Sequence, residues 1–125
     1  MNDILNMEKF KQGLIFGDIV YRGMRPTDID LVMEIRDKAW VIAEIKCGDK
    51  EVPTGQRLML ERLYNDLRSS GKKVICVVAS HNTPTNEDID ASTCMVREYW
   101  NGGRWVSYHK ATLKQFIEWF LKNII

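Results

Sequence analysis

The run from Trp40 to Cys47 constrains the fold of this chain more than any other segment. Its first four residues are apolar, so a β-strand formed here carries apolar side chains on both faces. Strands of this kind lie in sheets that other elements cover on both faces. The chain is therefore expected to fold as an α/β domain in which a central mixed sheet is flanked by helices.

The segment before this run predicts a partner strand. Residues 28–36 alternate between apolar and polar side chains, which is the pattern of a strand with two different faces. A turn at Arg36–Lys38, closed by Ile35 and Ala39, would join the two strands into an antiparallel hairpin. Because this turn has an odd number of residues, it fixes which side chains of the two strands share a face.

The predicted hairpin gathers charged side chains on one face. It places Asp30 opposite Glu44 and Asp28 opposite Lys46, and Glu44 and Lys46 share a face because side chains alternate. Adjacent carboxylates repel unless one is protonated or a cation lies between them. Carboxylate oxygens suit Mg²⁺ or Mn²⁺, and the carbonyl oxygen of Ile45 is a further candidate ligand. The same spacing is also common on strands that simply face solvent.

The remaining elements follow from apolar periodicity and from turn residues. In chain order we expect a helix from Asn2 or Asp3 to Gln12, a strand at 14–21, the hairpin, a helix at 53–70 ended by Gly71, a strand at 73–79, hairpin strands at 93–100 and 104–108, and a helix at 111–123. The order is α-β-β-β-α-β-β-β-α.

Length and charge limit the class of protein. A chain of 125 residues suits one domain, and 18 basic against 17 acidic residues give a formal net charge of +1, which disfavours a bulk polyanion binder. Three separated cysteines without CxxC spacing fit a reduced, cytoplasmic protein. No apolar run has the length of a membrane-spanning helix or of a signal peptide, so no membrane association is expected.

Three stretches together resemble the PD-(D/E)XK nuclease superfamily, which includes restriction endonucleases and Holliday-junction resolvases: residues 26–32, Ala43–Lys46 and Gly55-Gln56. The resemblance covers about residues 3–80 and matches the family's α-β-β-β-α-β core. It implies a restriction-endonuclease-like fold in a single domain over 1–125, with the hairpin and helix at 92–125 outside the core. It also implies a nuclease that hydrolyses phosphodiester bonds in DNA, including branched or structured DNA, with Mg²⁺ or Mn²⁺.

The resemblance assigns roles to the charged hairpin residues. Asp30 is similar to the family's metal-binding aspartate, Glu44 to its second metal ligand and Lys46 to its catalytic lysine. The family's Pro-Asp dipeptide is replaced here by Pro26-Thr27-Asp28. Either Asp28 or Asp30 can therefore be the primary ligand, and we favour Asp30 because it directly precedes the Leu-Val pair.

Two further residues match the family at less distinctive positions. Gln56 is similar to a helix glutamine that some branches place near the site, and Glu8 to a first-helix glutamate of the resolvase-like branch. Each also has an ordinary explanation. Gln56 can bond free backbone N–H groups at a helix start, and Glu8 can be a plain helix residue.

Two rival interpretations remain open. A catalytically inactive nuclease-fold module that binds DNA or a protein partner would suit the small size and near-neutral charge. A small-ligand α/β domain ranks last because no Gly-rich phosphate loop follows a strand. If the chain is a nuclease, one site cuts one strand, so cutting both strands would require a homodimer.

Some conspicuous side chains have ordinary explanations that outweigh functional ones. Basic residues of the 53–70 helix, Arg57 among them, can line a phosphate-binding edge but are more often solvated. Trp100, Trp105 and Tyr108 in the second hairpin can stack on bases, but such residues more often fill a core or an interface.

Overall fold

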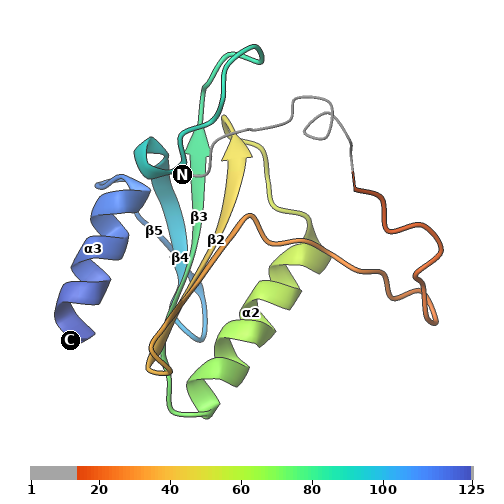
Figure 1. Cartoon of the computed structure of the whole chain (residues 1–125), viewed down its shortest axis with the longest axis horizontal. Helices are drawn as coiled ribbons and strands as arrows, with labels where there is room; N and C mark the ends of the chain where they lie inside the picture. Colours follow the sequence, from red (N-terminus) through yellow and green to blue (C-terminus); the bar gives the residue numbers. More distant parts are fainter. Residues whose placement is uncertain (1–13, 125) are drawn as a thin grey trace.

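A five-stranded mixed sheet, with neighbours in the order β1-β2-β3-β4-β5, forms the centre of the computed structural model (Figure 1). The structure describes residues 14–124. The elements are β1 (Leu31–Ile35), β2 (Ala39–Cys47), α2 (Thr54–Ser69), β3 (Lys73–His81), the short 3-10 helix η1 (Ala91–Thr93), β4 (Met95–Trp100), β5 (Trp105–Ser107) and α3 (Leu113–Ile124). β2 and β3 are parallel, and the other neighbouring pairs are antiparallel. The prediction of an α/β domain with a mixed sheet is confirmed.

The β1–β2 hairpin has the predicted register. Ile35 pairs with Ala39 and Leu31 with Ala43, so three residues form the turn. The first two turn residues, Arg36 and Asp37, have φ values of 46° and 62°, in the left-handed region that closes such short connections. The register prediction is confirmed for Leu31–Ile35, although β1 begins three residues after the predicted strand start at Asp28. This register determines the geometry of the site described below.

Helix α2 covers one face of the sheet, and its predicted bounds are correct to within one residue. Its buried residues Leu60 and Tyr64 pack in a cluster with Ile42, Cys76 and Trp100. The helix begins after Pro53, whose fixed φ suits a helix start. It ends before Gly71, which adopts a φ of 90° and so stops the helix in the left-handed conformation.

Helix α3 covers the opposite face, as Figure 1 shows. Leu113 and Phe116 pack with Ala43, Val77 and Val96. Successive residues of β2 therefore belong to different core clusters, Ile42 to that of α2 and Ala43 to that of α3. This confirms the prediction that the central strand is covered on both faces.

Residues 14–21 do not form the predicted strand. Gly17 has a φ of 59° within a turn, and Leu14 and Ile15 are 85% and 86% exposed. The segment extends away from the sheet, as Figure 1 shows. The prediction is wrong because apolar, β-branched side chains form a strand only when a neighbouring strand pairs with them and a core buries them.

Two other predictions concern the ends of the chain and its relation to membranes. The helix expected at residues 2–12, which contains Glu8, lies outside the described residues. Among residues 14–124, no helix combines the length and the apolar composition that a membrane crossing requires.

Candidate functional site

A buried carboxylate on β2 is the centre of the candidate site. Glu44 is 2% exposed and is the one buried charged or polar residue of the described chain. It directly follows Ile42 and Ala43, which have no exposed surface. Because a buried charge is costly without partners, the contacts of Glu44 indicate what the site can do.

Two hydrogen bonds that involve Asp30 and Glu44 cross the end of the hairpin. The backbone N–H of Asp30 donates to Oε1 of Glu44 at 3.2 Å. In return, the backbone N–H of Ile45 donates to Oδ2 of Asp30 at 2.7 Å. Two acids that are fourteen residues apart in the sequence thus meet at one point, as the hairpin register predicts.

Gln56 contributes the third side chain of the site from the first turn of α2. Its amide Nε2 donates to Oε2 of Glu44 and, at 3.4 Å, to the backbone carbonyl of Asp28. The two oxygens of Glu44 therefore have different donors, one from the strand end and one from the helix. The structure places Gln56 in the site rather than against free backbone groups of its own helix.

The surroundings of Glu44 favour its protonated form. Burial raises the pKa of this carboxyl group to about 7, and the neighbouring carboxylate of Asp30 adds to the effect, while Lys46 acts in the opposite direction. Near neutral pH, Glu44 is therefore close to the midpoint of its titration. A cation bound between the two acids would favour the ionised form.

Lys46 and the carbonyl of Ile45 complete the predicted set. Lys46 lies two residues after Glu44 on β2, so the two side chains share a face. The N–H of Ile45 points to Asp30, and the C=O of a strand residue points to the same strand edge as its N–H. The carbonyl oxygen of Ile45 is therefore directed toward the edge of β2 that Asp30 approaches.

Asp28 does not occupy its predicted place. The β1–β2 ladder begins with the pair Leu31 and Ala43, so the expected pairings of Asp28 with Lys46 and of Asp30 with Glu44 both lie beyond it. Asp30 nevertheless contacts Glu44 through its backbone N–H. The backbone carbonyl of Asp28 instead receives the Gln56 amide. This arrangement supports Asp30, rather than Asp28, as the acid that faces Glu44.

The donor set fits a hard divalent cation. Among residues 14–124, no group of three or more Asp, Glu, His or Cys side chains is placed around one point. What the structure offers is two carboxylates, Asp30 and Glu44, with one carbonyl oxygen, that of Ile45. This suits Mg²⁺, which is commonly bound through one or two carboxylates and keeps several of its waters or takes phosphate oxygens.

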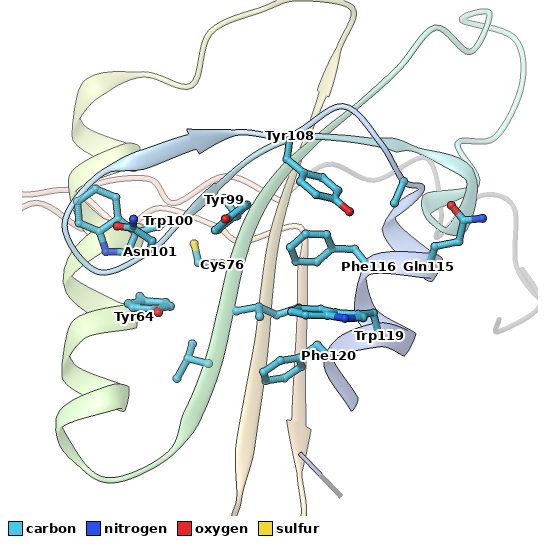
Figure 2. A pocket seen from close by; sticks show the side chains of 13 residues that line it. Tyr64, Cys76, Tyr99, Trp100, Asn101, Tyr108, Gln115, Phe116, Trp119 and Phe120 are labelled. Atoms are coloured by element: carbon cyan, nitrogen blue, oxygen red, sulfur yellow. The ribbon is translucent and has the colours of Figure 1, made fainter. Parts of the chain in front are cut away.

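A large pocket of the described chain lies elsewhere. It has a volume of about 590 Å³ and is lined by apolar and aromatic side chains that include Tyr64, Tyr99, Trp100, Phe116 and Trp119, as Figure 2 shows. None of its lining residues is acidic or basic. Burial raises the pKa of the Cys76 thiol in this pocket to about 12, so it is not a ready nucleophile. The buried carboxylate of Glu44 is not among the residues that line this pocket.

Sequence reasoning missed a second set of polar contacts. Arg57 forms an ion pair with Glu98, and its guanidinium lies 4.6 Å from the ring centre of Trp105. Its side chain is 20% exposed and paired, so it is not simply solvated. Glu98 is far from Arg57 in sequence, and the only signal for the pair was their opposite charge.

Comparisons of this chain with models of known protein families, with curated proteins and with solved structures gave no match. The functional assignment therefore depends on the contacts of Asp30, Glu44 and Gln56.

Proposed function

We propose that this chain is a nuclease that hydrolyses phosphodiester bonds in DNA with bound Mg²⁺ or Mn²⁺. The observation that carries the proposal is the contact between Asp30 and Glu44, with Gln56 on the second oxygen of Glu44. These residues belong to the stretches that resemble the PD-(D/E)XK superfamily. The mixed sheet with helices on both faces supports a restriction-endonuclease-like fold.

In the proposed site, Asp30, Glu44 and the carbonyl of Ile45 hold the cation. When bound, a divalent ion polarises a phosphodiester oxygen and makes a water molecule more acidic. Gln56 donates to one oxygen of Glu44 and so fixes the plane of that carboxylate. The buried position of Glu44 limits the water around it, which strengthens its attraction for a cation.

Lys46 acts on the reacting groups rather than on the cation. Lys46 shares a strand face with Glu44, so its ammonium can orient the attacking water and offset the negative charge that develops on the phosphate. Glu8 is a proposed assistant from the first helix, by resemblance alone. These roles require that Lys46 be charged during the reaction.

Replacement of single side chains tests the proposal. Glu44→Gln and Lys46→Ala are expected to abolish Mg²⁺-dependent cleavage of duplex, flap, junction and single-stranded DNA, because each removes a charge that the reaction needs. Glu118→Gln and Lys122→Ala on α3 are matched controls on the other face of the sheet and should cleave as the original chain does. Unchanged cleavage by the Glu44 and Lys46 variants would refute the assignment.

A nuclease-fold module that only binds DNA or a protein partner is the second candidate. The balance of 18 basic and 17 acidic residues favours it, since a strongly basic groove is not evident from composition. Calorimetric titration with Mn²⁺ separates the two functions. The nuclease proposal requires binding that Glu44→Gln removes, whereas the binding module requires no metal at Asp30 and Glu44.

A further inference from the structure

One stripe of α2 is attached to the C-terminal hairpin by three polar contacts. Its residues Arg57, Glu61 and Asn65 are spaced by four and therefore lie on one side of the helix. Each has a partner on β4 or β5. The pairs are Arg57 with Glu98, Glu61 with the indole Nε1 of Trp105 at 2.8 Å, and Asn65 with the indole Nε1 of Trp100 at 3.2 Å.

Trp105 joins two turns of the helix through a single side chain. Its ring lies under the Arg57 guanidinium, and its N–H donates to the carboxylate of Glu61. Trp105 also packs on Trp100, with ring centres 5.5 Å apart. Because successive contacts hold the same helix at different heights, they resist both rotation and sliding of α2.

The stripe is attached next to the candidate site. Gln56, which donates to Glu44, directly precedes Arg57 in the first turn of α2. That helix start has no side-chain cap of its own. A helix with its side chains is about 10–12 Å wide, so a rotation of about 10° moves a side-chain tip by about 1 Å. Protein N–H···O bonds vary over only about 2.7–3.2 Å, so such a rotation would break the Gln56 bond.

We propose that Glu98 and Trp105 are positioning residues for the metal site, which they serve by fixing the rotation of α2 and hence the place of the Gln56 amide. The importance of this role rests on the proposed function, whereas the contacts of α2 with Glu98 and Trp105 do not depend on it. The β4–β5 hairpin lies outside the region that resembles the nuclease superfamily. In this proposal the hairpin nevertheless supports the site by holding α2 in place. Neither residue touches the reacting atoms.

The test combines two variants with two measurements. Glu98→Gln removes the charge that pairs with Arg57, and Trp105→Phe removes the indole N–H while keeping an aromatic ring. Both are expected to shift the side-chain amide signals of Gln56 in ¹⁵N NMR spectra of the metal-free protein. Both should also weaken Mn²⁺ binding by about tenfold, as loss of support behind a metal ligand commonly does.

The matched controls are Glu118→Gln and Trp119→Phe, which make the same chemical changes on α3. They should leave the Gln56 signals and the Mn²⁺ affinity unchanged. If Glu98→Gln and Trp105→Phe lower the melting temperature but leave the Gln56 signals in place, the hairpin only stabilises the fold and the positioning role is wrong.

The NMR measurement also separates this proposal from the nuclease proposal. A shift of the Gln56 signals in a protein that binds no Mn²⁺ would uphold the positioning contact and refute the metal site. Mn²⁺ binding that is unaffected by both hairpin variants, with unmoved Gln56 signals, would uphold the metal site and refute the positioning role.

Discussion

At the scale of single residues, the protonation of Glu44 affects stability as well as metal binding. Its pKa is raised from the ordinary 4.5 to about 7 in the folded chain, chiefly by burial. Between these values the folded state keeps a proton that the unfolded state has lost. The contribution of Glu44 to the free energy of unfolding therefore falls as the pH rises from about 4.5 to about 7.

Glu44→Gln removes this dependence because an amide does not titrate in this range. In metal-free urea unfolding, the original chain is expected to be less stable at pH 7.5 than at pH 5, and the variant to show a smaller loss. Glu118→Gln, at an exposed site, is the control. Equal pH dependence in the original chain and in Glu44→Gln would show that the carboxyl group is not held in its raised-pKa environment.

The residues of the site differ in how far the sequence predicts them. The meeting of Asp30 and Glu44 follows from the alternation of two strands and one odd turn, which are local properties. The contact of Gln56 with Glu44 was expected only through the resemblance, because no spacing rule joins a helix start to a strand. No local sequence pattern predicts the pairing of Glu98, since its partner Arg57 is 41 residues away and the packing of whole elements decides the pair.

At the scale of elements, the β1–β2 turn controls whether the site exists. Side chains alternate between the two faces of a strand. Shortening the turn by one residue therefore shifts the register by one and moves every β1 side chain to the opposite face relative to β2. Deletion of Lys38 is therefore expected to separate Asp30 from Glu44 and to weaken Mn²⁺ binding by at least about tenfold. Calorimetry measures the affinity, and circular dichroism checks that the sheet is retained.

Deletion of Asn86 is the matched control, since this residue lies in the loop between β3 and η1. It should leave the affinity for Mn²⁺ intact. A folded Lys38-deletion variant that binds Mn²⁺ as tightly as the original chain would contradict the role given to the register.

Elements were predictable where their own residues determine them. Helix α2 has a Pro start, a Gly stop and an apolar stripe, and β2 is apolar on both faces. Residues 14–21 show the limit of such reasoning, because their apolar side chains are exposed where no strand pairs with them. Apolar and β-branched residues indicate that a segment can be a strand, but the partner strand is a property of the whole fold.

At the scale of the whole molecule, the described chain offers one candidate metal site. In the proposed nuclease, one site per chain would break one DNA strand in each event, so cutting both strands would require a second chain or a second encounter. With Mg²⁺ and dilute protein, supercoiled plasmid is expected to become nicked circles before linear molecules appear. Gel electrophoresis over time measures both products.

Glu44→Gln is the control and should produce neither form. Linear product that appears without a preceding nicked circle would mean that two sites act together in an assembled dimer. Repeating the experiment at rising protein concentration separates a stable dimer from one that forms only on DNA.

The two hydrogen bonds of Asp30 and Glu44 across the hairpin have a consequence for the evolution of such a chain. Each acid also satisfies a backbone N–H of the opposite strand, so the atoms proposed for catalysis fasten the open end of the hairpin as well. If the chain is the proposed nuclease, a descendant that lost the reaction would still gain stability from both acids, because each accepts a hydrogen bond from a backbone N–H across the hairpin.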